Sequence, residues 1–336
     1  MARRNSKTNN APRTPRTTPS RKATLGPKRK KWLECLHGED ENAIGRQIDA
    51  LLWDLRSWST INDARRWAPQ DENGNPMVCG MMHGLLDRCF ATTQLVAVRR
   101  LCDGSYSIEN PRRGVWSLVS LLKDMKENAH LLTRRAMFRA EGLRYDLKSL
   151  ERDRERVLRA RQFGPEEGTA MPSSSSPVEL LHTAEQRHKQ VDLLAGVANT
   201  ERSGNDQVRP ELFEALRSRL EATSADARDR VNKYLAHAAP PKIRPNSLTS
   251  SPTPKAFFTA ASVIKETFDF ISEVVLGEGY VFFGVELVDN LEHIDCPLVR
   301  TEDVPRVQSV WDKTKDRFPS SCRDWGQFVN DLSLQT

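Results

Sequence analysis

Residues 77–104, MVCGMMHGLLDRCFATTQLVAVRRLCDG, contain the strongest periodic pattern in the chain. Apolar side chains recur there at intervals of three and four residues, the spacing that places them on one face of an α-helix. The pattern ends at Asp103-Gly104, a typical helix end. We therefore expect a helix over 77–102 whose apolar stripe faces the core. The stripe consists of Val78, Met81, Met82, Leu85, Leu86, Cys89, Phe90, Thr93, Val96, Ala97 and Leu101.

Helical spacing returns on both sides of this segment. The sequence predicts further helices over 41–58, 114–137, 143–162, 178–196, 210–237, 255–276, 302–317 and 323–332. Only residues 280–288 have strand character, and because a lone strand cannot form a sheet, an extended loop is the alternative. The predicted fold class is all-α: an antiparallel helical bundle with a disordered basic N-terminal tail and a short C-terminal appendage.

Charge is concentrated at the N-terminus. The first 31 residues contain eleven Lys or Arg and no acid, whereas the whole chain has a net charge of only +6. Their Pro, Thr, Ser and Asn cannot bury enough apolar surface to order this segment. We expect a disordered tail over 1–38, which either binds phosphates by releasing counterions or only keeps the protein in solution.

Two further boundaries follow from composition. The helical bundle is expected over 39–277, with a flexible Ser- and Pro-rich insert at 163–177. Residues 278–336 form the C-terminal appendage, and the sequence leaves open whether it is a separate lobe or packs back on the bundle.

Several classes of protein do not fit this chain. The mean hydropathy is −0.60, and no apolar run reaches the roughly 18 residues that a membrane span needs. The six cysteines show no CxxC pair, so we expect reduced, mostly buried thiols in a cytoplasmic protein. We find no phosphate-binding loop, dinucleotide fingerprint or metal-ligand spacing, and therefore expect no cofactor and no metal. His182 and His188 lie on a polar helix and are expected to be solvated.

One candidate site occupies the end of the predicted helix 210–237. In RVNKYLAH, residues 230–237, seven steps of about 100° return His237 to the side of Arg230. Lys233 lies between them, with Tyr234 at the edge of the same face. Arg can hold a phosphate by two parallel hydrogen bonds, and imidazole can take a proton from a ribose 2′-hydroxyl and later return it. A purely structural alternative pairs Arg230 with Asp226 and places His237 at the negative end of the helix dipole.

These residues resemble the signature of the HEPN superfamily, in which an Arg is followed after a short gap by a His on a helix. The ending NKYLAHA, 232–238, is similar to the abortive-infection (AbiU-like) branch in bacteria, as are QLVAVRRLCD, 94–103, and SLVSLL, 117–122. The similarity would cover 40 to about 277. One departure is Val231, since the family usually has a polar residue directly after the Arg, and the nearest amide here is Asn232.

The resemblance implies a helical bundle that dimerises so that two motifs face one cleft. Many members are metal-independent ribonucleases in which the 2′-hydroxyl of the RNA attacks the adjacent phosphate. By this resemblance His237 is the general acid/base, Arg230 binds the scissile phosphate, and Asn232, Lys233 and Tyr234 contact the substrate.

Arg99, Arg100 and Asp103 form a second candidate group. One of the two arginines must lie close to the apolar stripe, and a half-buried Arg needs a carboxylate partner such as Asp103 or Asp124. We expect structural pairing here rather than contact with RNA.

Two functional classes remain open. The first is a homodimeric ribonuclease of a bacterial defence or toxin–antitoxin system, with RNA and an antitoxin or other protein as partners and no membrane contact. The second is a non-catalytic helical module that binds protein or nucleic acid.

Overall fold

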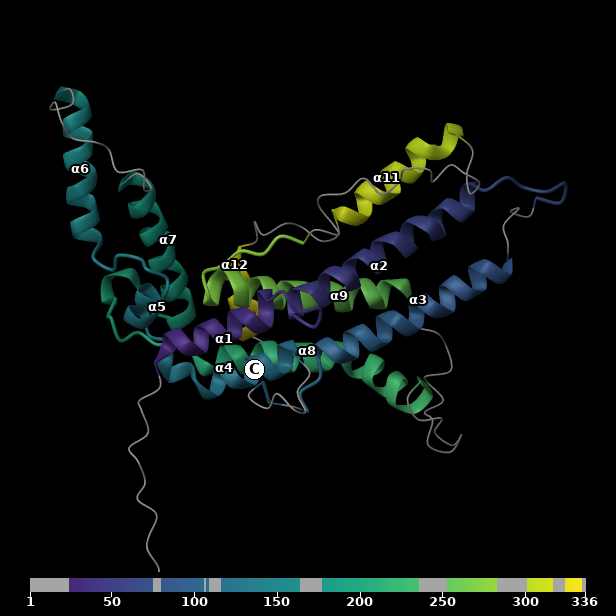
Figure 1. The fold of residues 1–336 in the computed structure, drawn as a ribbon, viewed down its shortest axis with the longest axis horizontal. Helices are drawn as coiled ribbons and strands as arrows, with labels where there is room; N and C mark the ends of the chain where they lie inside the picture. Colours follow the sequence, from purple (N-terminus) through teal and green to yellow (C-terminus); the bar gives the residue numbers. More distant parts are fainter. Residues whose placement is uncertain are drawn as a thin grey trace, which may run out of the picture.

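The computed structural model describes residues 24–74, 80–105, 107–108, 116–163, 177–235, 253–282, 301–316 and 324–333. Every named element in these ranges is a helix (Figure 1), and an isolated bridge joins Thr133 to Gln207. The principal helices are α1 (Leu25–His37), α2 (Ile44–Ala64), α3 (Gly80–Leu101), α4 (Leu118–Glu127), α5 (Arg134–Ala140), α6 (Leu147–Phe163), α7 (Pro177–Ala195), α8 (Pro210–Arg230), α9 (Pro254–Asp269), α11 (Val304–Lys315) and α12 (Trp325–Ser333). Short 3₁₀ turns lie at Arg65–Trp67, Ala129–Leu131, Asn199–Glu201 and Thr301–Asp303, and π-helical turns at Val231–Leu235 and Phe270–Val275.

The central helices are antiparallel, as the sequence predicts. Gln94 of α3 donates to the Leu51 carbonyl of α2 at 3.4 Å, whereas the later Trp58 of α2 donates to the earlier Asp87 of α3 at 2.9 Å. α8 runs antiparallel to α4 beside it, and α3, α4, α8 and α9 together enclose the core (Figure 1). The all-α bundle is therefore confirmed within the described residues.

The predicted orientation of α3 is wrong at several positions. Leu85 is 53% exposed and Val96 43% exposed, and Cys89 is also exposed. α3 has a second apolar face, which is the one that packs against α2 and α8. That buried face consists of Phe90, Leu95, Val98, Leu101 and Cys102. The prediction is right for Phe90 and Leu101, which belong both to the predicted stripe and to this buried face, and wrong for the stripe residues that lie outward.

The predicted single helix over 114–137 is two helices. α4 ends at Asn128, whose side-chain amide donates to the Asp124 carbonyl at 2.8 Å. A 3₁₀ turn follows, and α5 begins after Thr133, whose hydroxyl accepts from the Ala136 amide at 3.4 Å. Both capping residues are visible in the sequence, but the apolar period continues across them and conceals the break.

The predicted end of the disordered tail at residue 38 is also wrong, because α1 is helical and packed. Trp32 is fully buried, and its indole Nε1 donates to Asp124 Oδ2 at 2.7 Å. Lys28 forms an ion pair with the same carboxylate at 3.1 Å. The cations that made this segment resemble a tail thus fix α1 to the bundle. Residues 1–23 lie outside the described residues, as do residues 164–176 of the insert predicted at 163–177, whose first and last residues belong to α6 and α7.

The described parts of the C-terminal region pack back on the bundle. Phe328, Val329 and Leu332 of α12 belong to the main core. α11 lies along α2 (Figure 1), where Trp311 and Val307 form a small second cluster with Ala64. The sequence left open whether the C-terminal region is a separate lobe. These two helices instead pack on the bundle.

Residues 277–282 belong to neither a helix nor a strand. The Tyr280 ring lies 5.2 Å from that of His37 and 5.3 Å from that of Phe268. The described residues 280–282 are therefore a loop and not a strand, and residues 283–288 lie outside the described ranges.

Candidate functional site

The candidate motif lies at the end of α8. Pro210 occupies the first turn of this helix, where its missing N–H costs nothing. After 21 residues the regular winding ends at Arg230, and residues 231–235 form a π-helical turn. Val231 is buried at the start of this turn, whereas Leu235 at its end is 43% exposed. The π-helical turn therefore begins at a buried residue and ends at an exposed one.

Arg230 takes part in the ion pair that the structural alternative predicted. Its Nε donates to Asp226 Oδ2 at 2.8 Å, one helical turn back. The Arg230 side chain is 11% exposed, but that of Asp226 is 51% exposed. An anion that binds Arg230 would compete with this exposed carboxylate, which solvent already screens.

The π-helical turn changes the geometry that the sequence suggested. A π turn takes more residues per turn than an α-helix, so seven steps from Arg230 no longer return to the same side at 100° each. Asn232 is half-buried within this turn. The side chains of Lys233 and Tyr234, and all of His237, lie outside the described residues. Whether Arg230 and His237 face one space thus stays a prediction.

The second candidate group is structural where its contacts are described. The Arg100 guanidinium donates to the Asn42 side-chain carbonyl, just before α2. The Asp103 carbonyl accepts from the hydroxyls of Ser117 and Ser120, which closes the loop between α3 and α4. The expected alternative partner, Asp124, lies elsewhere and serves α1. Arg99 is half-buried on α3.

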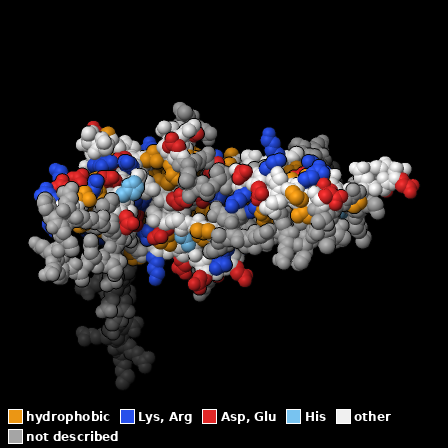
Figure 2. Space-filling view, turned by 90° about the horizontal axis from the view of Figure 1, so that it is seen from above, with side chains coloured by type: hydrophobic (Ala, Val, Ile, Leu, Met, Phe, Trp, Pro, Cys, Tyr) orange, Lys and Arg blue, Asp and Glu red, His pale blue; other side chains and the backbone are white. Residues whose placement is uncertain are grey.

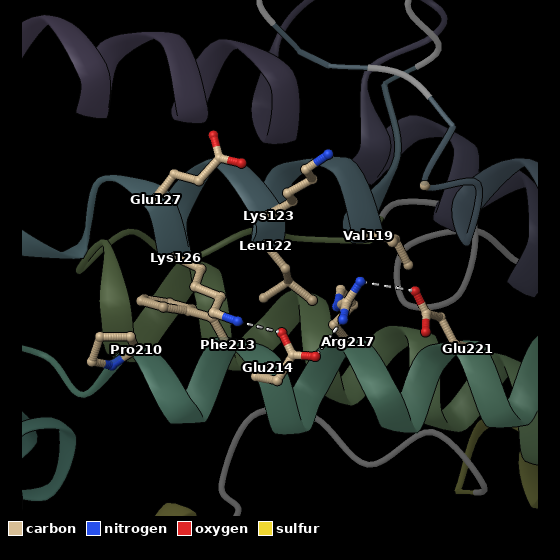
Figure 3. Close-up of a pocket in the computed structure, with 11 residues that line it drawn as sticks. Val119, Leu122, Lys123, Lys126, Glu127, Pro210, Phe213, Glu214, Arg217 and Glu221 are labelled. Atoms are coloured by element: carbon tan, nitrogen blue, oxygen red, sulfur yellow. Dashed lines mark hydrogen bonds and ion pairs between the residues drawn. The ribbon is translucent and has the colours of Figure 1, made fainter.

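A groove that the sequence did not indicate lies between α4 and α8 (Figure 3). Its volume is about 380 Å³, and its apolar residues are Val119, Leu122, Pro210 and Phe213. Lys126 of α4 pairs across it with Glu214 of α8 at 2.8 Å, and within α8 Arg217 pairs with both Glu214 and Glu221. Hydrogen bonds from Arg217 and Lys126 lower the pKa of Glu214. Lys123 and Glu127 extend from α4 on the side away from α8 (Figure 3).

This groove has the size of a small-molecule site and nearly balanced charge. Three cationic and three acidic side chains line it, beside an apolar wall. Its signal in the sequence was the alternation of acids and bases on α8, which is also typical of an ordinary exposed helix. A second, wider groove of about 740 Å³ lies along α8 and α9, where Arg219 pairs with Glu266 at 2.8 Å.

The most buried charges lie at the other end of α8, around Arg134 of α5. This side chain is fully buried, and it donates to Asp206 at 2.9 Å and to Asp192 at 2.7 Å. It also donates to Nδ1 of His188 at 3.1 Å, and Nε2 of His188 lies 3.1 Å from the Tyr145 carbonyl. Because Nδ1 accepts a hydrogen bond and Nε2 faces a carbonyl acceptor, we assign His188 as neutral with its proton on Nε2.

The prediction that His188 is solvated is therefore wrong, although His182 is exposed as expected. Burial lowers the pKa of His188. A second buried arginine on α7, Arg187, forms an ion pair with Glu141 and donates to the Val275 carbonyl at 2.9 Å. These contacts join α5, α7, the loop before α8 and the π turn after α9, so they account for the buried charges without a substrate.

The thiols in the described part of the chain differ in their burial. Cys35 and Cys102 are free and buried, and burial raises the pKa of each to about 12. The expectation of buried thiols holds for these two but not for exposed Cys89. Within the described ranges, no three His, Cys, Asp or Glu side chains are grouped so that they could hold a metal ion. No helix in the described part of the chain has both the length and the apolar composition that a bilayer crossing requires.

Comparison with protein-family models, with curated proteins and with solved structures finds no match to this chain.

Proposed function

We propose that this chain is a HEPN-like, metal-independent endoribonuclease of a bacterial defence or toxin–antitoxin system, acting in the cytoplasm. Arg230 binds the scissile phosphate, and His237 is the general acid/base. Asn232, Lys233 and Tyr234 contact the RNA on either side of the scissile bond. The metal independence and the system type rest on the resemblance of these residues to the family.

The reaction needs only the RNA and these side chains. His237 accepts the proton of a ribose 2′-hydroxyl, and the 2′-oxygen attacks the adjacent phosphorus. The bond from phosphorus to the 5′-oxygen breaks, and that oxygen receives a proton from the imidazolium. The products are a 2′,3′-cyclic phosphate and a 5′-hydroxyl. Arg230 stabilises the charge that develops on the non-bridging oxygens of the phosphate.

The observation that carries this proposal is the position of Arg230. It is the last residue of α8, directly before the π-helical turn that contains Asn232, Lys233 and Tyr234. Single π turns within α-helices are frequent at functional sites. Val231 packs into the body beside it, so the turn is held on one side.

The alternative is a non-catalytic helical module that binds protein or nucleic acid. One observation favours it: the ion pair with Asp226 accounts for Arg230 without a substrate.

The two classes differ in what they do to RNA in EDTA. We expect the wild-type chain to cut a mixed pool of RNA and to leave 2′,3′-cyclic phosphate ends. His237→Ala and Arg230→Ala should each lower the rate by at least about a hundredfold, as expected for loss of an acid–base or charge-stabilising group. The matched control is Arg228→Ala, because Arg228 is an exposed arginine on the same helix.

A substrate with a 2′-deoxy sugar at the cleaved position tests the chemistry itself. We expect no cleavage at that position, because the nucleophile is missing. Three outcomes would contradict the nuclease and favour the binding module. They are cleavage at the 2′-deoxy position, an equal loss of cleavage rate in all three alanine variants, and RNA left intact by the wild-type chain.

We also propose a homodimer, with an antitoxin or other protein as a further partner. The dimer is supported by the exposed apolar face of α3, where Leu85, Cys89, Thr92 and Val96 follow one another at intervals of four, three and four residues. This spacing is typical of a seam between two helices.

The dimer is testable by light scattering during size-exclusion chromatography. We expect Val96→Glu to shift the wild-type dimer to monomer. Leu158→Glu is the matched control, because Leu158 is 41% exposed but lies on α6. A wild-type chain that is monomeric at all concentrations contradicts the proposal.

A further inference from the structure

α6 and α7 form a hairpin that stands away from the bundle, which we call the arm (Figure 1). Its two helices contact each other. Leu150 of α6 and Leu181 and Ala184 of α7 are buried. The remaining faces of α6 are therefore presented to solvent.

The outer face of α6 is basic. Lys148, Arg152, Arg156 and Arg159 follow one another at intervals of four, four and three residues and are all exposed. At about 100° per residue they fall within one sector of the helix, on the side away from Leu150. We call these four residues the basic stripe. Over the whole of α6, six Lys or Arg stand against three acids. Figure 2 shows Lys and Arg side chains, interleaved with acidic ones, at the arm end of the molecule.

The acids of α6 hold the basic stripe only weakly. Arg156 lies 3.7 Å from Asp153, and Arg159 lies 3.5 Å from Glu155, with the two arginine side chains 82% and 74% exposed. Asp153 is engaged more closely by Arg144, at 2.7 Å. Exposed pairs of this kind contribute little stability, so a phosphate can replace the acids at small cost.

The base of the arm is fixed by the buried arginines. Arg134 joins α5 to α7 through Asp192, and Arg187 joins α7 to Glu141 and to the turn after α9. The two arginines at the base of the arm are both buried and paired with carboxylates, which is not typical of a loosely attached appendage. These contacts fix the base of α7 to the bundle, and α6, which carries the basic stripe, packs on α7.

The N-terminal cations join the chain at the same end. α1 contacts α5, and Arg29 near its start pairs with Glu278 at 2.8 Å beside the base of the arm. The sequence that precedes Thr24 has no acid and seven cationic residues: Arg3, Arg4, Lys7, Arg13, Arg16, Arg21 and Lys22. The residues before Thr24 are therefore joined to the described chain at the end of the molecule that carries the arm.

The motif lies at the opposite end of α8. This helix starts beside α5, since the loop before it bonds to Leu132 through the Val208 amide at 3.1 Å. Its 21 residues carry Arg230 roughly 30 Å away.

We propose that the basic stripe is an anchoring site for the phosphate backbone of RNA, separate from the motif. Its recognition is by charge and is independent of base sequence. The anchor rests on the proposed function for its choice of RNA as the ligand, and it requires RNA long enough to contact the arm and the end of α8 together.

The test measures how RNA binding depends on salt. The probe is a fluorescent 2′-O-methyl RNA of about 20 nucleotides, long enough for a multi-contact site and unable to react because its 2′-oxygen is blocked. Fluorescence anisotropy gives the affinity in 50 to 200 mM NaCl. The variant carries Lys148→Gln, Arg152→Gln, Arg156→Gln and Arg159→Gln, with folding checked by circular dichroism and thermal unfolding.

We expect the slope of log affinity against log salt to fall by about 0.7 for each phosphate that the variant leaves unneutralised, hence by up to about 3. Between 50 and 200 mM salt the wild type should then lose up to about fiftyfold more affinity than the variant. The control removes four exposed cations at other places: Arg66→Gln, Arg88→Gln, Lys313→Gln and Lys315→Gln. Its net charge equals that of the variant, and its slope should stay close to the wild-type value.

Equal slopes in the variant and the control would overturn the anchor. So would a stripe that is needed for vesicles containing phosphatidylglycerol but not for RNA, because the surface would then recognise lipid. Cleavage is measured separately, with unmodified RNA. If RNA binding depends on the basic stripe but no RNA is cleaved, the nuclease is refuted and the anchor is supported. If RNA is cleaved but the stripe variant keeps the wild-type salt slope, the anchor is refuted and the nuclease is supported.

Discussion

Among single residues, His188 has the most constrained protonation state. Its Nδ1 accepts from a fully buried guanidinium, and its ring lies 4.4 Å from that of Phe138. A proton on Nδ1 would break the bond from Arg134 and place two cations side by side. The folded protein therefore selects the neutral imidazole.

This selection makes the stability depend on pH. Burial lowers the folded-state pKa of His188 below its ordinary value of 6.5, which the unfolded chain retains. The stabilisation is thus present above pH 6.5 and is lost as the pH falls below it. We expect the free energy of unfolding in urea to decrease from pH 7.5 to 5.5, with at most about 1.4 kcal/mol per pH unit from this one proton.

His188→Gln should flatten this decrease, because glutamine supplies an acceptor and a donor but does not titrate. Burial also lowers the pKa of His37, so part of the decrease should remain. The matched control is His182→Gln on the same helix, where the side chain is exposed. If His188→Gln keeps the full wild-type slope, the neutral assignment is wrong.

The sequence could not predict the burial of this residue. Its neighbours on α7 are Arg187 and Lys189, which indicate a solvated face. The partners that bury it, Arg134 and Tyr145, are more than forty residues away in the chain. By contrast, the pair between Arg230 and Asp226 was predictable, because both residues lie on one helix at a spacing of four.

At the scale of elements, α1 shows how composition can conceal a helix. Leu25, Trp32, Cys35 and Leu36 are buried on one side of it, but the run from Lys28 to Lys31 dominates its composition. Helices such as α2 and α9 were predictable, because one apolar stripe stands against a polar background. α3 was predictable in extent but not in orientation, since both of its faces carry apolar residues and only contacts with α2 and α8 decide between them.

The packing of α1 can be tested by substitution. Trp32→Ala removes a fully buried ring and the partner of Asp124, so we expect a loss of about 3–5 kcal/mol in the free energy of unfolding. Lys30→Ala on the exposed side of α1 should change it by less than about 0.5 kcal/mol. Urea unfolding followed by circular dichroism measures both, and similar values for the two variants would contradict the packed helix.

At the scale of the whole molecule, the core is divided unequally. One large cluster extends from α1 to α12, and a small one joins α11 to α2. In the small cluster Trp311 lies edge-on to Trp53 and beneath the guanidinium of Arg56. Because α11 buries so little apolar surface, it should open without the rest of the protein.

Hydrogen exchange followed by mass spectrometry can separate the two clusters. We expect Trp311→Ala to raise amide exchange in α11 by at least about tenfold and to leave α8 unchanged. Phe328→Ala in α12 is the matched comparison, because Phe328 packs on Phe270 and Arg219 in the large cluster. Phe328→Ala should raise amide exchange in α8 as well as in α12. An effect confined to α12 would show that α12 is attached to the bundle as loosely as α11.

The π-helical turn at the end of α8 has a consequence for how this region tolerates changes in length. Because it already winds more slowly than the helix before it, the loss of one residue would restore regular winding rather than break the helix. The four remaining residues would each turn through the larger angle of an α-helix, which would offset most of the rotation that the lost residue supplied, and Arg230 would stay in place. The turn can therefore absorb the loss of one residue with little change in the direction of the helix, while the bundle keeps its packing.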